Sequence, residues 1–450
     1  MYKFFYIAII LYVFSAPVYA QTPDNPFGNR DDADTSNSYS PPSVFVTKIN
    51  LEPQKDNEKL DGKFTIWNSE KQVISGLLYR IDFLDPLPQT DQNSGDIQDT
   101  AAIYDRYVSN EPFYLIPNER KEISFSYDLP NVPSGKYRIE ITATNSLGRD
   151  MGWWDADVQI TDKNISFLRI ITGPVHLPEF PDRDIPSQAG PNVNPKSSFS
   201  VNIKAVNDGK NAIKALPIMD LYEFDVARGK LSTIKGNEFS LNSQKTKDIS
   251  FPVTASEKPA VYYGILYLTD PVSGKVISNL TEYRWVVRGI HAEIISQRVN
   301  TFVTKKGEKM DLRVDMVGPA DAETKVKTKL TVQILDQGGL VGETTVGGLE
   351  LSDAVLSGNG LIELKRDLQD KAIISLTLNN EKNGSELDQI QMSLEGYENI
   401  KKTTVMNKKN LLYSGIVMIL VAIAVSIALS KRTKTSKRHP KIDKNNKIVI

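Results

Sequence analysis

Acidic side chains gather in one polar segment of the sequence, at residues 85–105. Within it, Asp91, Asn93 and Asp96 have the oxygen-rich character of a Ca²⁺ loop, because Ca²⁺ prefers carboxylate and carbonyl oxygens. Gly95, however, stands one position early, and no glutamate follows at the position of the bidentate ligand. We therefore expect a solvated insertion without a metal, with a Ca²⁺ site as the alternative.

Trp153 and Trp154 are the second feature that could bind a ligand. Adjacent residues of a strand point to opposite faces, so one ring should fill the core and the other should be exposed or covered by a neighbouring domain. An exposed indole could stack on a sugar, but the interface role is favoured. The candidate partner-binding residues are Asp85, Asp91, Asp96, Asp99, Trp153 and Trp154.

Residues for catalysis are scarce in this sequence. The three histidines, His176, His291 and His439, are scattered, and no cysteine occurs. The motifs of a serine-nucleophile elbow, a zinc protease and a phosphate loop do not appear. We expect no enzymatic activity, no catalytic residue and no cofactor. The alternative is a carbohydrate-binding or glycan-processing envelope component, whose enzymatic form would need two carboxylates at glycosidase spacing.

One sequence pattern, called the repeated phrase below, occurs twice in the elements that would carry these residues. Residues 122–137 read EISFSYDLPNVPSGKY and residues 248–263 read DISFPVTASEKPAVYY, each with a Tyr twelve residues after the Phe. Apolar residues around both copies recur at every second position, and Gly, Pro, Asn and Asp separate the runs. This pattern is typical of short strands that bury one face.

The phrase predicts two core strands joined by a loop. Phe125 and Phe251 would face the core, while Tyr137 and Tyr263 would begin the next strand. Each Tyr hydroxyl would bond to backbone near the corner, as in the tyrosine corner of immunoglobulin-like sandwiches.

The repeat extends beyond the phrase itself. FTIWN at residues 64–68 aligns with VNIKAVNDG at 201–209, and a fainter third copy places Leu364 and Leu376 twelve residues apart, after the alternating run at 325–334. A repeating unit built of several short strands in this way is typical of a sandwich of about seven strands. The predicted fold class is all-β: tandem immunoglobulin-like antiparallel β-sandwiches plus one C-terminal transmembrane helix.

The patterns V-x-I-x-x-x-N-x-G at 201–209 and S-G-K-Y-x-I-x-I at 134–141 resemble adhesion-related immunoglobulin-like domains of prokaryotic surface proteins, the CARDB type among them. The resemblance covers residues 43–290. The third unit departs from it, because it lacks the Gly-x-Tyr element. The resemblance implies a binding or spacer role on the cell exterior and names no ligand.

The two ends of the chain predict its compartment. Lys3, an apolar run and the small residues before Gln21 form a signal peptide pattern at 1–20. Residues 410–430 carry no charge and would span about 30 Å as a helix. The tail at 431–450 holds eight Lys or Arg against one acid, which predicts a cytoplasmic tail and an outer N-terminal portion.

The net charge and the absence of cysteine limit the kinds of partner and the compartment that we expect. Without Lys3, the eight basic tail residues and Asp443, the chain keeps 45 basic and 54 acidic residues, a net charge of −9. Nucleic acid is therefore not an expected partner, since phosphate binding needs a basic face. A large ectodomain without cysteine favours a prokaryotic envelope.

We therefore expect a non-enzymatic, single-pass cell-membrane protein used in adhesion, scaffolding or partner binding. Its partners would be the membrane and an extracellular protein or glycan. Three sandwiches end to end would project the first one outward with the binding site, while the third would be a spacer near the membrane. The predicted divisions are a signal peptide (1–20), a disordered leader (21–42), sandwiches at 43–162, 163–288 and 289–397, a juxtamembrane linker (398–409), the transmembrane helix (410–430) and a basic tail (431–450).

Overall fold

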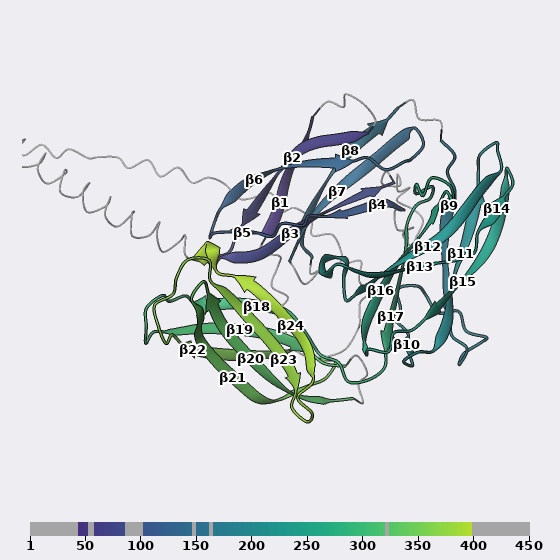
Figure 1. Cartoon of the computed structure of the whole chain (residues 1–450). Coiled ribbons are helices and arrows are strands. Elements are labelled where there is room, and N and C mark those ends of the chain that lie inside the picture. Colours follow the sequence, from purple (N-terminus) through teal and green to yellow (C-terminus); the bar gives the residue numbers. More distant parts are fainter. Residues whose placement is uncertain are drawn as a thin grey trace, which may run out of the picture. The chain divides into compact units, whose positions relative to one another are not determined.

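The computed structural model describes residues 44–52, 58–85, 102–145, 150–161, 165–319 and 324–397. These residues are almost entirely β-structure, with a 3-10 turn, η1 (Val226–Arg228), between two strands (Figure 1). The predicted all-β class is confirmed. The strands form antiparallel sheets apart from one short parallel pair, β10 with β17.

The first sandwich has a sheet of order β1-β2-β6 and a sheet of order β4-β3-β7-β8, with β5 paired to β3. Alternate residues of both sheets meet in one core that includes Phe64, Ile81, Phe83 and Ile141, all fully buried. The strands are β1 (Val44–Leu51), β2 (Lys59–Asn68), β3 (Ile74–Leu84), β4 (Ile103–Val108), β5 (Phe113–Leu115), β6 (Arg120–Asp128), β7 (Gly135–Asn145) and β8 (Asp150–Ile160).

The second sandwich pairs the sheet β15-β11-β9 with the sheet β10-β17-β16-β12-β13, and β14 pairs with β12. Its core contains Val201, Phe251, Tyr283 and Trp285. The strands are β9 (Arg169–His176), β10 (Asn192–Val193), β11 (Ser198–Asn207), β12 (Ile213–Glu223), β13 (Lys230–Lys235), β14 (Phe239–Leu241), β15 (Lys245–Thr254), β16 (Ala260–Thr269) and β17 (Thr281–Val287).

The third sandwich pairs β18-β19-β22 with β21-β20-β23-β24. Leu364 and Leu376, the predicted counterparts of the repeated phrase, are both buried in its core. The strands are β18 (Glu293–Thr301), β19 (Lys309–Val317), β20 (Val326–Asp336), β21 (Gly339–Leu351), β22 (Leu356–Glu363), β23 (Ile373–Asn380) and β24 (Glu386–Ser393).

The repeated phrase lies where the sequence predicts, with one correction. Phe125 and Phe251 are buried in the cores, and the Tyr137 hydroxyl donates to the Pro133 carbonyl oxygen at 2.9 Å. In the second copy it is Tyr262 that makes this contact, with the Lys258 carbonyl oxygen at 2.9 Å. The prediction for Tyr263 is wrong, because the loop before β16 is one residue shorter and places Tyr263 on the outer face.

A buried asparagine also recurs at the aligned strand ends. The Asn68 amide nitrogen donates to the carbonyl oxygens of Gln72 and Leu115, and that of Asn207 donates to those of Asn211 and Leu241. Each side chain satisfies the backbone groups of a turn that would otherwise be unpaired in the protein interior. The alignment of 64–68 with 201–209 therefore reflects a shared turn structure.

The described residues belong to one compact unit, and all three sandwiches contact one another within it. The Tyr397 hydroxyl, after the last strand of the third sandwich, donates to the Val73 carbonyl oxygen of the first at 3.1 Å. Both residues belong to the core cluster of the third sandwich. An end-to-end series has no contact between its first and third members, so this contact departs from the predicted linear array, while the spacer role of the third sandwich stays a prediction.

Several predictions fall outside the described residues. These are the signal peptide at 1–20, the leader at 21–42, the linker at 398–409, the helix at 410–430 and the tail at 431–450. Among the residues that the structure does describe, none form a helix of the length and hydrophobicity that a membrane crossing requires.

Candidate functional site

Both tryptophans of β8 are exposed. Trp153 is 42% exposed and Trp154 is 47% exposed, so the expectation that one ring fills the core is wrong. The reason is Gly152, whose missing side chain lets β1 pass so closely that an added Cβ would overlap the Val44 carbonyl oxygen. Val44 is fully buried and closes the core at this edge, so Trp154, on the same face of β8 as Val158 and Ile160, lies beyond the core, while Trp153 is on the outer face.

The strand next to Gly152, β1, carries one ring of a stacked aromatic pair in the other sheet. The rings of Phe45 and Trp67 stack with centroids 5.5 Å apart, and the Arg120 guanidinium lies 5.1 Å above the Trp67 ring. An added Cβ on Gly152 would lie 3.4 Å from Phe45 Cα, so the strand that carries both tryptophans passes next to this stack. We use the name aromatic strip for the four aromatic residues that β1, β2 and β8 carry near this strand crossing, Phe45, Trp67, Trp153 and Trp154.

The acidic segment is described only at its start and end. Asp85 accepts a hydrogen bond from the Tyr104 hydroxyl at 2.6 Å, which is a contact between two residues of the first sandwich. Asp91, Asn93, Asp96 and Asp99 lie outside the described residues. Across the part of the chain that is described, no group of three or more potential ligands is placed to hold a metal ion.

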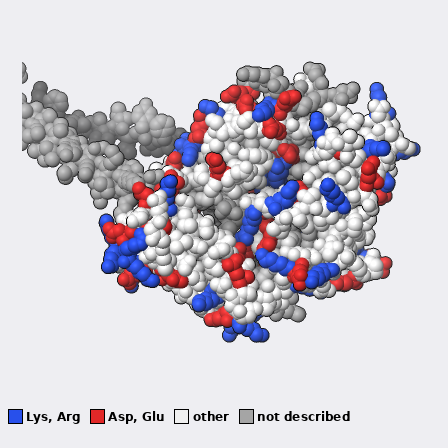
Figure 2. Space-filling model, viewed as in Figure 1, with Lys and Arg blue, Asp and Glu red and all other residues white. Residues whose placement is uncertain are grey.

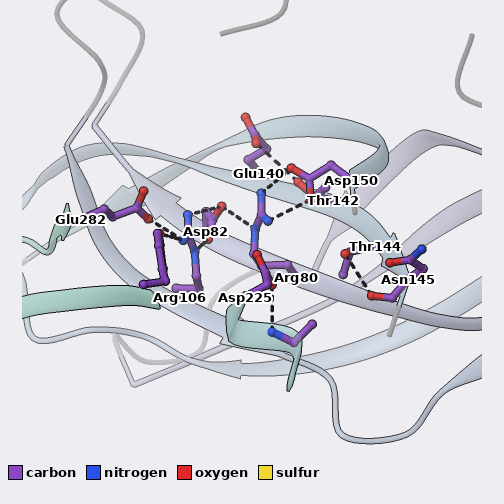
Figure 3. Close-up of polar contacts among 12 residues, drawn as sticks. Arg80, Asp82, Arg106, Glu140, Thr142, Thr144, Asn145, Asp150, Asp225 and Glu282 are labelled. Atoms are coloured by element: carbon purple, nitrogen blue, oxygen red, sulfur yellow. Dashed lines mark hydrogen bonds and ion pairs between the residues drawn. The ribbon is translucent and has the colours of Figure 1, made fainter. Parts of the chain in front are cut away.

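The sheet β4-β3-β7-β8 carries charges on its outer face. Its register places Arg106, Asp82 and Glu140 in one row across β4, β3 and β7, with Arg80 in the next row. We call Arg80, Asp82, Arg106, Asp150 and Glu282 the charged network. Figure 3 shows Arg80 and Arg106 converging on Asp82 from either side.

The bonds within the charged network are short and mostly buried. Arg106 Nε donates to Asp82 Oδ1 at 2.6 Å, and Arg80 Nε donates to Asp82 Oδ2 at 2.9 Å. Arg80 also binds both carboxylate oxygens of Asp150, at 2.9 and 3.2 Å. The Asp82 side chain is only 4% exposed, so two guanidinium groups compensate a carboxylate removed from water.

The network continues into the second sandwich. Arg106 Nη1 donates to Glu282 Oε1 of β17 at 2.5 Å (Figure 3). The same nitrogen donates to the Tyr263 hydroxyl of β16 at 2.8 Å. Nearby, the Leu280 backbone nitrogen donates to the Ile103 carbonyl oxygen at 2.6 Å. Arg106 therefore joins two sheets from different sandwiches, which is the chemistry of a specific interface.

Burial and neighbouring charges change the pKa values here in opposite directions. Burial alone would raise the pKa of Asp82, but Arg106 and Arg80 together hold it below its ordinary value. Burial, with Asp82 next to it, raises the pKa of Glu140. Burial, and to a smaller extent the negative charge of Glu282, raises the pKa of Tyr263 well above its ordinary value. Asp82 is therefore ionised and Tyr263 keeps its proton at neutral pH.

The functional side chains separate into two groups. Phe45 and Trp67 form a stacked pair, and β8, which carries Trp153 and Trp154, passes β1 at Gly152, whereas Asp85 belongs to a separate internal contact. The charged network was not among the predicted site residues. The sequence feature that could have indicated the charged network is the alternation in β3. There, Arg80 and Asp82 interrupt an apolar strand on the face opposite the core. Charges at such positions are ordinarily solvated, so burial at an interface could not be inferred from them.

No family model matches the chain, and comparison with curated proteins gives no match. Solved structures with some likeness include activated Escherichia coli alpha-2-macroglobulin (13% identity, TM-score 0.25, 77% of this chain and 32% of that one). Red sea bream transglutaminase is another (10% identity, TM-score 0.24, 51% of this chain and 31% of that one). This chain thus spans about a third of either protein. At such TM-scores the likenesses carry no argument about fold or function.

Proposed function

We propose that this chain is a non-enzymatic surface protein of a prokaryotic envelope that binds an extracellular protein or glycan through the aromatic strip of its first sandwich. The observation that carries the proposal is the exposure of Trp153 and Trp154 on β8, the strand that passes the Phe45 backbone of the stacked Phe45–Trp67 pair at Gly152. Large aromatic side chains left on a surface are enriched at binding sites, because they supply much contact area at a small loss of side-chain entropy.

The fold assignment within this proposal is finer than an all-β class. Sandwiches with a tyrosine corner at Tyr137 and Tyr262 support immunoglobulin-like domains of the adhesion-related kind. Basic and acidic side chains are interspersed on the face shown in Figure 2, which supports a partner other than nucleic acid.

Membrane anchoring is part of the proposal and is supported by sequence alone. The uncharged run at 410–430 and the basic residues after it favour an N-terminal portion outside and a cytoplasmic tail. Protease added to intact cells should remove the portion before residue 410 and leave the tail protected. Recovery of residues 21–409 from the cytosol would contradict this topology.

The test of the binding site is the variant Trp153→Ala/Trp154→Ala in the full chain. We expect it to lose binding to envelope fragments and to glycan arrays at least tenfold, with the melting temperature unchanged because both rings lie outside the core. The control is Phe180→Ala, which removes an aromatic ring that is also 47% exposed but belongs to the second sandwich. Equal binding by wild type and the tryptophan variant would contradict the proposal.

The carbohydrate alternative has its own observation. Each exposed indole is suited to stacking on a sugar ring, and Trp emission reports such stacking directly. The chain has four tryptophans, of which Trp285 is buried, so a saccharide that quenches the exposed indoles leaves a residual core signal. Saturable quenching by a purified envelope glycan would assign the strip to carbohydrate. Binding to envelope protein without quenching by glycan would assign it to a protein partner.

A further inference from the structure

One guanidinium binds two carboxylates across the contact between the second and third sandwiches. Arg228, the last residue of η1, donates from Nη2 to Glu293 Oε1 at 2.8 Å and from Nη1 to Asp388 Oδ1 at 3.2 Å. Their side chains are 16%, 12% and 8% exposed, respectively. Two carboxylates from β18 and β24 therefore share one positive charge away from water.

The groups around Glu293 and Asp388 do not add a second positive charge to match the two carboxylates. Asp388 Oδ2 also accepts the Ile294 backbone N–H at 2.8 Å, so its ionised form is held from two directions. The other charged groups facing Glu293 are Glu223 and Asp225, both acidic. Lys258 binds Glu223 at 2.6 Å and neutralises it.

Two further neighbours do not supply the missing charge. Asp225 accepts the Ala227 backbone N–H, and its carboxylate interacts electrostatically with the guanidinium groups of Arg80 and Arg106 of the first sandwich. His291 lies two residues before Glu293, but burial lowers the pKa of its imidazole, which is neutral at neutral pH. A proton on Glu293 is the simplest way to balance the pair of carboxylates on Arg228.

We propose that Arg228, Glu293 and Asp388 form a proton-dependent clasp, in which Glu293 carries a proton while the second and third sandwiches are in contact and loses it when they separate. The protonated carboxyl keeps its contact with Arg228 and leaves Asp388 as the single anion. Loss of the proton places two anions on one buried cation, and water entry then favours separation.

The direction of the pH dependence follows from the environment of Glu293. Burial raises the pKa of Glu293 to about 8 in the assembled protein, against an ordinary value of 4.5 for a solvated glutamate. A raised pKa stabilises the contact fully below the solvated value, and this stabilisation is lost as the pH rises towards 8. One proton linked to the contact changes the equilibrium between closed and open forms by up to about tenfold per pH unit in that window.

The experiment measures opening of this contact in the full chain. The backbone N–H of Ile294 is bonded to Asp388, so its hydrogen-exchange protection, corrected for the intrinsic rate, reports the clasp. We expect protection in wild type to fall between pH 5 and pH 8 by up to about tenfold per unit. In Glu293→Gln, which keeps the shape without an ionisable group, protection should be independent of pH.

A second variant keeps the test decisive if Glu293→Gln disturbs the contact. Asp388→Asn leaves one carboxylate for one guanidinium, so Glu293 ionises without unbalanced charge and the pH dependence should disappear as well. The matched control is Glu282→Gln in the charged network. In this variant the protection of the Ile294 N–H should change with pH as it does in wild type. Wild-type protection that does not change with pH, or a slope that persists in both clasp variants, would overturn the proposal.

Discussion

At the scale of residues, the recurring device is a buried arginine that binds two carboxylates on different elements. Arg106 binds Asp82 and Glu282, and Arg228 binds Glu293 and Asp388. The planar guanidinium suits this task, because its donors point in several fixed directions and it stays charged when buried. Such pairs define one relative orientation of the joined strands, although their net contribution to stability depends on complete compensation.

Removing one of these arginines tests this compensation. We expect Arg106→Leu to lower the free energy of unfolding by about 3 kcal/mol or more, since Glu282 loses its partner and Asp82 keeps only Arg80. Lys63→Leu is the control, because Lys63 binds Glu122 at 3.1 Å on an exposed surface. It should cost less than about 1 kcal/mol. Urea denaturation measures both, and equal losses would contradict the role of burial.

The tyrosines of the second copy provide another prediction. A double-mutant cycle should show coupling between Tyr263→Phe and Arg106→Leu of about 0.5 kcal/mol or more, since their side chains are in contact. Tyr262→Phe should add independently to Arg106→Leu and cost about 1 kcal/mol on its own, because it removes the bond to the Lys258 carbonyl oxygen. Free energies from urea denaturation give both quantities. Coupling at Tyr262 rather than Tyr263 would reverse the assignment.

How far the sequence predicts these residues depends on how local their causes are. Phe125, Phe251 and Leu376 are predicted correctly, since alternation alone determines which face of a strand is buried. Tyr263 is not, because a loop one residue shorter moves it to the other face. The contact between Arg106 and Glu282 joins residues 176 positions apart, and no pattern in one sequence indicates such a partner.

At the scale of elements, the position of β1 against β8 decides whether the tryptophans are buried. The sequence predicts both strands, but it does not reveal that Gly152 admits the backbone of β1 at the sheet edge. A side chain at that position would hold the two strands apart and open the core beside Val44. The aromatic strip thus depends on a glycine that the pattern of strands does not single out.

Gly152→Ala tests this dependence. We expect a loss of about 2 kcal/mol or more in the free energy of unfolding, because the added Cβ overlaps the Val44 carbonyl oxygen and backbone must move. The control is Gly360→Ala in β22, where an added Cβ would lie 3.4 Å from Thr344 Cγ2, an ordinary contact. Urea denaturation and the Trp emission maximum would be measured together. A Gly152→Ala variant as stable as the control would show that β1 tolerates a wider separation.

At the scale of the whole molecule, three cores are joined by interfaces that are partly apolar and partly ionic. Val226 and Tyr263 of the second sandwich pack with Val108 of the first, next to the contact of Arg106 with Glu282. Buried apolar contact favours association without selecting an orientation, whereas the ion pairs penalise every other arrangement. Together they account for contacts among all three sandwiches, where the sequence predicted a linear series.

This arrangement leads to a prediction about fragments. Residues 43–162 and 163–288 each contain both sheets of one sandwich and their own core, so each should unfold cooperatively when expressed alone. Separation leaves Arg106 without Glu282 and Tyr263, and each fragment should melt below its temperature in the full chain. For domains of about 100 residues, each kcal/mol lost corresponds to about 4–8 °C. Calorimetry of the fragments and of the full chain measures the difference. If neither fragment folds, the two sandwiches form one folding unit, and if both melt as in the full chain, the interface contributes nothing to stability.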